Sequence, residues 1–230
     1  MTLHKVELEL ALELLSPLHI GAGYGVAGYL DARVVTDENG YPYVPGSSLK
    51  GRLRYYLAGL LPALGAGDGQ PGPETNLFGE RRPEEERELA GTLHFGDLRL
   101  TPAWRDLFDA AGLQPVSSGL ITERRANVML SRLRGVALER RLFSVEAAPL
   151  HVGFTGGIAG HLPDCGRLVT VGGQSCPRDL ALLVVACQAL THLGGRKSRG
   201  LGRCRLTIVQ GTLRVGEQPV EPAQLLEALR

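Results

Sequence analysis

The N-terminal segment alternates apolar and acidic side chains, and this pattern constrains the fold more than any other. Apolar residues stand at every second position from 6 to 14, and glutamates fill most positions between them: Val6, Leu8, Leu10, Leu12 and Leu14, with Glu7, Glu9 and Glu13. A period of two places the two sets on opposite faces of a β-strand. The sequence therefore predicts a half-buried strand whose outer face meets water.

Five further elements are predicted along the chain. Leucines recur at helical spacing at positions 49, 53, 57 and 60, and an apolar stretch at residues 177–195 predicts a second, buried helix. Strands are predicted at residues 91–100, within 142–154 and at 201–209. A shorter strand is expected at residues 30–35, and residues 61–75, rich in Gly and Pro, are expected to form a loop.

The main elements follow the order strand, helix, strand, strand, helix, strand. This order predicts an α+β fold with a ferredoxin-like βαββαβ core, which is also the arrangement of a modified RNA-recognition motif. With 230 residues, 43% of them hydrophobic, the chain can bury one sizeable core. We expect a single domain over residues 1–230, with insertions around 16–46, 62–90 and 101–141.

The charges are segregated along the chain, although the net charge is only +1. Residues 121–141 hold six Arg against two Glu, and residues 194–205 hold four Arg and one Lys with no acid. Such segregation predicts one basic face. Few aromatic residues interleave these runs, so charge is expected to matter more than base stacking in any binding of RNA.

The sequence predicts a cytoplasmic protein that holds no metal ion with its own side chains alone. No uninterrupted apolar stretch marks a membrane span or a secretory signal. The four cysteines form no CxxC pair. His161, Cys165 and Cys176 could supply three zinc ligands, but reduced cytosolic thiols are the favoured interpretation.

The stretch "PYVPGSSLKGRLRYYL" at residues 42–57 leads into the first predicted helix. Ser47 or Ser48 is expected to cap that helix, because a hydroxyl accepts a bond from an otherwise unpaired backbone N–H. A helix N-terminus also attracts anions, and Lys50, Arg52 and Arg54 would add positive charge. The stretch therefore predicts a phosphate site, with a simple capped helix on a turn as the alternative.

Two more segments combine basic residues with turn-forming or extended sequence. In "LGGRKSRGLGRCRL" (193–206), glycines alternate with cations that include Arg196, Lys197 and Arg199, which suits a loop that wraps an anion. In "TERRANVMLSRLRG" (122–135), arginines flank an apolar centre, which suits a basic hairpin along an RNA strand. A tight turn and an exposed hairpin remain the alternatives.

These pieces stand in a familiar order. The segments "SPLHIGAG", "LDARVV", "GYPYVPGSSLKGRLR", "NLFGE", "GTLHFGDLRL", "RANVMLSRLRGVA" and "LGGRKSRGLGRCRL" run through nearly the whole chain. In this order they resemble the RAMP superfamily of CRISPR proteins. Within it, the chain looks most like the backbone subunits that line the guide RNA in type III effector complexes.

The resemblance implies roles for particular residues. Asp31 matches an aspartate that supports cleavage of target RNA. Lys50 and Arg54 match a basic helix on guide-RNA phosphates, and Arg125 and Arg132 match a hairpin that wedges between RNA segments. The remaining residues expected to bind RNA are His19, Ser47, Ser48, Arg52, Arg196, Lys197 and Arg199. A weakly held Mg²⁺ or similar divalent cation, shared with RNA oxygens, would assist Asp31.

The expected partners are guide RNA, complementary target RNA and other CRISPR effector subunits, with copies of the chain in a head-to-tail array. Residues 21–29 and 125–137 are the segments expected to reach the next copy, and no membrane is expected. A non-catalytic structural or capping subunit is one alternative. Another is a metal-independent guide-RNA processing endonuclease with a histidine base, for which His19, His94 and His151 are candidates.

Overall fold

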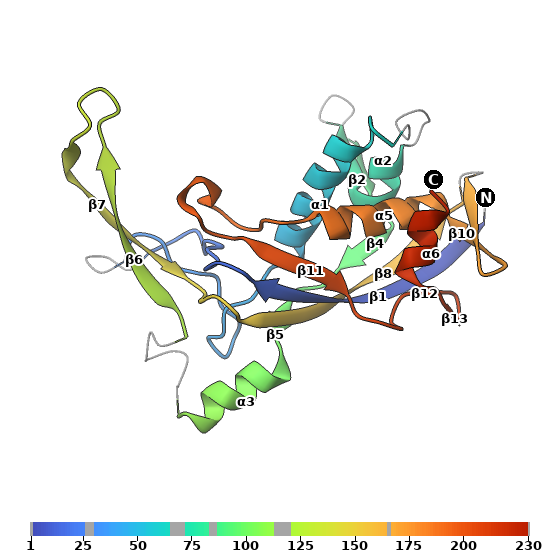
Figure 1. Ribbon diagram of the computed structural model, residues 1–230, viewed down its shortest axis with the longest axis horizontal. Coiled ribbons are helices and arrows are strands. Elements are labelled where there is room, and N and C mark those ends of the chain that lie inside the picture. The colour runs from blue at the N-terminus through green and yellow to red at the C-terminus, as the bar shows by residue number, and fades with distance from the viewer. Residues whose placement is uncertain are drawn as a thin grey trace.

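A seven-stranded sheet forms the centre of the fold, and β1 (Leu3–Leu14) lies in its middle (Figure 1). The computed structural model describes residues 2–25, 30–64, 72–82, 87–112, 121–164 and 167–229. The other strands of this sheet are β4 (Leu93–Phe95), β5 (Arg99–Leu100), β8 (Gly153–Pro163), β11 (Cys204–Ile208), β12 (Arg214–Val215) and β13 (Gln218–Pro219).

All pairings in this sheet are antiparallel. One edge of β1 pairs with β8 over nearly its whole length, from Leu3 opposite Pro163 to Glu13 opposite Gly153. The other edge is divided between β11 and β12. Beyond β8 lie β4 and β5, so the order of the main strands across the sheet is β11, β1, β8, β4.

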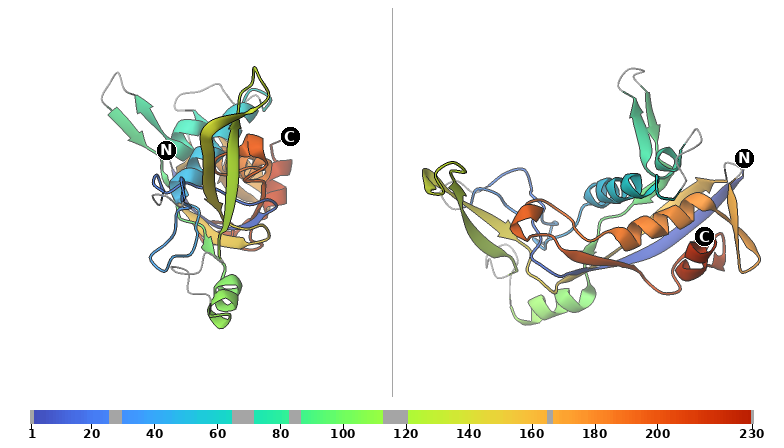
Figure 2. Two further views of the ribbon diagram at one scale, coloured as in Figure 1. Left: turned by 90° about the vertical axis from the view of Figure 1, so that its left-hand side faces the viewer. Right: turned by 45° about the horizontal axis from the view of Figure 1, so that its top comes forward.

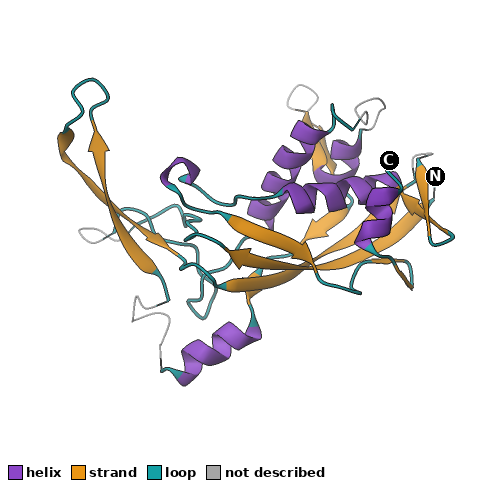
Figure 3. Ribbon diagram, in the orientation of Figure 1, coloured by secondary structure: helices purple, strands orange, loops and turns teal. Residues whose placement is uncertain are grey.

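The alternating sequence of β1 produces the predicted half-buried strand. Its alternating apolar residues from Val6 to Leu14 are at most 3% exposed and belong to one core cluster with the leucines of two helices. These helices, α1 (Gly46–Leu60) and α5 (Arg178–Ala189), lie side by side on one face of the sheet (Figures 2 and 3). The glutamates of β1 lie on the opposite face, where water solvates them.

The predicted order of main elements is confirmed as β1, α1, β4, β8, α5, β11. The protein is therefore a mixed α/β fold built on antiparallel sheets. Smaller elements fill the insertions and the C-terminal part. They are α2 (Pro73–Phe78), β2 (Gly79–Arg82), β3 (Arg87–Ala90), α3 (Pro102–Ala110), β6 (Glu123–Leu130), β7 (Ala137–Ala147), β9 (Leu168–Val171), β10 (Gln174–Pro177), η2 (Lys197–Arg199) and α6 (Pro222–Glu227).

The strands β6 and β7 form a hairpin that projects from one end of the sheet, far from both termini (Figures 1 and 2). The basic hairpin predicted at residues 122–135 is thus confirmed in its first strand and turn. No helix in the described part of the chain is long and apolar enough to cross a membrane.

Several predicted boundaries are wrong, for local reasons. Residues 30–35 form isolated bridges rather than a strand, because successive residues pair with different segments. The strand predicted at 91–100 is split, since Leu98 turns away to exchange backbone hydrogen bonds with Val44. The strand spacing within 142–154 spans the end of β7 and the start of β8.

Two helix predictions also need correction. The second helix ends at Ala189, and the chain turns back so that Leu193 N–H donates to the carbonyl of Gly202. The loop predicted at 61–75 gives way to α2 at Pro73, a residue favoured at the first position of a helix because it needs no hydrogen-bond partner there.

We expect truncation of Leu53 to destabilise the protein strongly. Leu53 is fully buried between α1 and the sheet, whereas Leu133, at the hairpin turn, is 94% exposed. Leu53→Ala should lower the free energy of unfolding by about 2–5 kcal/mol, because it leaves a cavity. The matched Leu133→Ala should change it by less than about 0.5 kcal/mol. Urea denaturation of both variants checks this, and equal losses would contradict the assigned core.

Candidate nucleic-acid interface

The base of the projecting hairpin brings together three segments that are far apart in the sequence. Residues 143–146 of β7 contact residues 31–34, His19 and the glycine-rich loop after α5. Three of the segments that the sequence singled out therefore meet at one strand. We define this region as the hairpin base.

Asp31 is held by Ser144 at the edge of β7 in the hairpin base. Its carboxylate oxygen Oδ2 accepts hydrogen bonds from the backbone N–H of Ser144, at 2.6 Å, and from the Ser144 hydroxyl, at 3.4 Å. The backbone N–H of Asp31 donates to the carbonyl of Ser144. Asp31 is exposed while Ser144 is buried, so a fixed carboxylate faces solvent.

Glu146 fastens the same segment two residues further along β7. Its Oε2 accepts the backbone N–H of Val34 at 3.0 Å, and its Oε1 accepts the hydroxyl of Thr122 at 2.5 Å. Its own backbone N–H donates to the carbonyl of Ala32. Reasoning from sequence missed both Glu146 and Ser144, because the residues 31–34 that they hold lie more than a hundred residues away.

His19 contacts the hairpin base through its ring. Its Nδ1 lies 2.6 Å from the carbonyl oxygen of Glu146. A carbonyl oxygen only accepts, so the proton is on Nδ1, and Nε2 of the neutral ring is an acceptor. His19 is buried, and its own carbonyl accepts the backbone N–H of Gly195. It therefore joins the hairpin base to the glycine-rich loop.

The glycines of that loop are required by close backbone contacts. Gly202 has a φ of +81°, and a Cβ there would lie 1.9 Å from the carbonyl oxygen of Leu193. Gly194 has a φ of +69°, and a Cβ there would lie 2.4 Å from the carbonyl oxygen of His19. Only glycine adopts this conformation cheaply and leaves the space clear. The predicted tight turn after the helix is thus present, and it carries the basic residues outward.

Arg196 and Arg199 of this loop both lie over the ring of Phe143, each with its guanidinium carbon 4.9 Å from the ring centroid. Successive side chains of a strand point to opposite faces, so Phe143 and Ser144 face opposite ways. The basic loop therefore lies over the face of β7 that carries Phe143, whereas residues 31–34 lie beside the edge of β7, where Ala32 forms a parallel bridge with Val145.

Helix α1 does not begin as the sequence predicted. Its N-cap is Pro45, with no side-chain cap, so the expected capping by Ser47 or Ser48 is wrong. The Oδ1 of Asp97 accepts the backbone N–H of Gly46 at 2.8 Å. A Cβ at Gly46 would lie 1.9 Å from the carbonyl oxygen of Phe95, so protein already packs against this end of the helix.

The basic residues of α1 have partners within the protein. The Nζ of Lys50 lies 5.9 Å from the ring centroid of Phe95. Arg52 donates from Nε to the carbonyl of His192 at 3.2 Å, and Arg54 donates to the carbonyl of Gly79. Lys50 and Arg54 were expected to be exposed, but both are half-buried.

Arg125 and Arg132, the hairpin arginines expected to bind RNA, are exposed. Arg125 pairs with Glu123 at 2.5 Å, and Arg132 lies in the turn between the strands. Exposed apolar side chains surround them, among which Leu133 is the most exposed. The hairpin thus presents both charge and apolar surface.

A metal site made of protein side chains alone is absent from the described residues, which hold no group of three or more His, Cys, Asp or Glu positioned as ligands. In the proposed zinc set, Cys165 lies outside the described residues. Burial raises the pKa of Cys187 and of Cys204 to about 12, so both thiols stay protonated at neutral pH.

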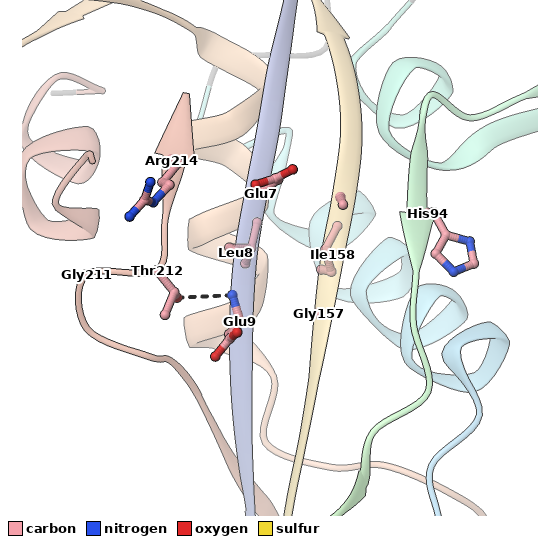
Figure 4. A pocket seen from close by; sticks show the side chains of 10 residues that line it. Glu7, Leu8, Glu9, His94, Gly157, Ile158, Gly211, Thr212 and Arg214 are labelled. Carbon is pink, nitrogen blue, oxygen red and sulfur yellow. Dashed lines mark hydrogen bonds between the residues drawn. The ribbon is translucent and has the colours of Figure 1, made fainter. Parts of the chain in front are cut away.

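The other candidate histidines lie elsewhere. His94, on β4, lines a pocket of about 510 Å³ on the open face of the sheet, together with Glu7, Glu9 and Arg214 (Figure 4). His151 has a φ of +66° in the turn before β8. Residues 26–29, in the stretch expected to reach a neighbouring copy, lie outside the described residues.

Comparison with curated proteins finds relatives of one kind. Three are named "CRISPR system Cms endoribonuclease Csm3". The relative from Enterococcus italicus is 28% identical over 213 residues, which cover 89% of this chain and 90% of the relative. The relative from Streptococcus thermophilus is 27% identical over 228 residues, which cover 96% of each chain.

Solved structures share the fold. A chain of the type III-B Cmr-beta cryo-EM structure in the apo state aligns with a TM-score of 0.58 and 15% identity, covering 89% of this chain and 97% of that chain. A chain of Cmr-beta bound to cognate target RNA aligns with a TM-score of 0.59 and 16% identity, covering 91% and 98%. The model of the RAMP superfamily matches residues 11–205, and because this match spans most of the sequence, the chain belongs to the RAMP superfamily.

Proposed function

We propose that this chain is a guide-RNA-binding backbone subunit of a type III CRISPR interference complex and that it cleaves complementary target RNA. One observation carries the proposal: Ser144 holds an exposed carboxylate, Asp31, at the edge of β7, while a basic loop lies over the Phe143 face of the same strand. Such an arrangement suits a guide RNA that is bound and kept and a target RNA that is cut. The names of the curated relatives and the Cmr-beta structures support it.

We infer that the core is ferredoxin-like. The sequence order βαββαβ combines with the spatial order β11, β1, β8, β4 and with wholly antiparallel pairing, which is the pattern expected for this core. That the chain is one domain over residues 1–230 stays a prediction, as does its cytoplasmic location.

In this proposal the guide RNA lies on the basic side. Lys197 and Arg199 are exposed and Arg196 is half-buried, and all three point from a loop that the glycine turn holds in place. Lys50 and Arg52 add charge from α1, and His19 joins the loop to the hairpin. Arg125 and Arg132 extend the contacts along the hairpin. Backbone phosphates are the natural ligands of such a set, so little sequence preference is expected.

The cleavage proposed for Asp31 uses the nucleophile that RNA itself carries. The 2′-hydroxyl oxygen bonds to phosphorus while the bond from phosphorus to the 5′ oxygen of the next nucleotide breaks. The 2′-hydroxyl loses its proton and the leaving 5′ oxygen gains one. The protein must hold these atoms in line and stabilise the charge on the phosphate.

A divalent cation is part of this proposal, and the residues fit a weak site. Asp31 offers one exposed carboxylate whose Oδ1 accepts no hydrogen bond from the described residues, while Oδ2 is held by Ser144. One carboxylate shared with RNA oxygens is a common way to bind Mg²⁺. When bound, Mg²⁺ would polarise the scissile phosphate.

One observation favours a second candidate, a non-catalytic structural or capping subunit of the same complex. The hydrogen bonds between Asp31 and Ser144 would also explain Asp31 as a purely structural residue. The alternative of a metal-independent processing endonuclease depends on His19 as the general base. The acceptor Nε2 of its ring favours this role, and the burial of its side chain opposes it.

For partners, we propose other effector subunits and a head-to-tail array of copies along the guide. The exposed apolar side chains of the hairpin support this, because they are unsuited to water: Val128, Met129, Leu130, Leu133, Val136, Leu138 and Leu142. Such heterologous contacts repeat without closing on themselves.

Replacing Asp31 should abolish cleavage and leave RNA binding intact. Asp31→Asn keeps an acceptor for the Ser144 N–H but removes the charge, so cleavage of a complementary target with Mg²⁺ should fall about a hundredfold or more. RNA retention should hold or tighten, because an anion leaves a basic region. The matched control is Asp106→Asn on α3. Because the Asp106 side chain is exposed, a complex that carries this variant should cleave at the wild-type rate. Single-turnover cleavage by the assembled complex measures both.

The same assay separates the alternatives. If the Asp31→Asn complex cuts at the wild-type rate, the catalytic assignment is wrong, and a subunit that never cuts supports the structural alternative. Cleavage that persists in EDTA would favour the histidine endonuclease.

Removing charge from the basic loop should weaken RNA binding in a salt-dependent way. Lys197 is exposed, so Lys197→Ala should leave folding unchanged. In fluorescence anisotropy with single-stranded RNA, the slope of log affinity against log salt should shrink by about one for each lost phosphate contact. Lys5→Ala is the control, because Lys5 already pairs with Glu7 at 2.6 Å on the other face of the sheet. An unchanged slope for Lys197→Ala would argue against the loop as a phosphate site.

Arg54 should affect stability as well as binding. Its guanidinium donates to the carbonyl of Gly79, where α2 meets β2. Arg54→Ala should therefore lower the free energy of unfolding by about 1–3 kcal/mol, because a half-buried carbonyl loses its charged donor. Arg132→Ala, in the exposed hairpin turn, should change it by less than about 0.5 kcal/mol. Urea denaturation measures both, and an unaltered Arg54→Ala midpoint would show that the bond contributes nothing.

A further inference from the structure

Tyr55, on the outer face of α1, is an exposed aromatic ring between two cations from different parts of the chain. It is 65% exposed, although tyrosine usually buries most of its ring. The guanidinium carbon of Arg52 lies 4.6 Å from the centroid of its ring, and the Nζ of Lys197 lies 5.9 Å from it. The basic loop after α5 therefore reaches α1 at this ring.

The neighbours of Tyr55 hold it in place without covering it. Tyr56 meets its ring edge-on, with centroids 5.8 Å apart and planes at 87°. Tyr56 is itself held, because its hydroxyl lies 3.0 Å from the hydroxyl of Thr191. Arg52 is anchored through Nε on the carbonyl of His192, 3.2 Å away. Tyr56 thus positions the ring through an edge-on contact and Arg52 lies over it, and both groups have other partners.

The helix leaves space beside this ring. Helical side chains lean toward the N-terminus, so Tyr55 leans toward the residue one turn earlier, which is Gly51. A Cβ at Gly51 would meet nothing within 4 Å, so no packing contact requires glycine there. Glycine makes an exposed helix less stable than alanine would. An open space next to an aromatic face can admit a flat group.

We propose that Tyr55 stacks against one unpaired base of a bound single-stranded RNA, whose phosphates are contacted by Arg52 and Lys197. This inference rests on the proposed function, and it adds a base contact to a surface otherwise assigned to phosphates. Aromatic rings flanked by cations are the usual platform for single-stranded nucleic acid, and they accept any base because every base has a flat face. The two cations beside the ring, Arg52 and Lys197, favour RNA as the ligand, because they can contact its phosphates.

The test compares two substitutions and two RNAs. Full-length wild type, Tyr55→Phe and Tyr55→Leu are titrated by anisotropy into a fluorescein-labelled single-stranded oligoribonucleotide, and into an abasic oligomer of the same length. Tyr55→Leu should weaken binding to intact RNA on the order of tenfold, because a stacked base is lost. Tyr55→Phe should stay within about twofold, because the ring remains. The salt dependence should not change, because no cation is removed.

On the abasic oligomer, wild type and Tyr55→Leu should bind equally. An equal loss on both oligomers would overturn the inference, because the effect would then come from the helix or its charges. The inference would also be overturned if Tyr55→Leu bound intact RNA as tightly as wild type does. This includes the case in which the variant impairs subunit assembly but not RNA binding. If wild type itself binds neither oligomer, the proposed function fails as well, so the two failures are distinguishable.

Discussion

The hydrogen bonds that β7 makes at Ser144 and Glu146 determine where the candidate site lies. Through them β7 fixes residues 31–34 beside its edge, while the backbone of Glu146 holds His19. The ring of Phe143, on one face of β7, contacts two arginines of the glycine-rich loop. The hairpin therefore holds separate segments of the chain together. The position of each residue along β7 determines which of these segments it contacts.

The sheet and its helices could be predicted because their patterns are local. The period-two alternation of β1 and the leucine spacing of α1 each report a face that must be buried, and the structure has both. Residues 30–35 have a similar local pattern but form no strand, because each residue finds a different partner. The start of α1 was mispredicted for a related reason. The acceptor at its first N–H is Asp97, about fifty residues away, and nearby serines could not reveal that.

The candidate site was predictable in its residue types and not in its contacts. Clusters of Arg, Lys and Gly were visible in the sequence, and the structure gathers several of them at the hairpin base. Their exposure was not visible, and Arg54 uses its guanidinium on a backbone carbonyl. The basic runs also seemed poor in aromatic residues. In space, however, Phe143 and Tyr55 supply rings to Arg199 and Lys197, which follow them by more than fifty residues in the sequence.

The projecting hairpin is joined to the sheet at its base and extends away from it (Figures 1 and 2). Ser144 lies seven residues from Ala137, the end of β7 nearest the turn, a distance of about 23 Å for an extended strand. A rotation of about 5° at the base would move the turn by about 2 Å over that length while shifting Asp31 very little. The turn can therefore follow irregularities in whatever it contacts, while the carboxylate of Asp31 stays where Ser144 holds it.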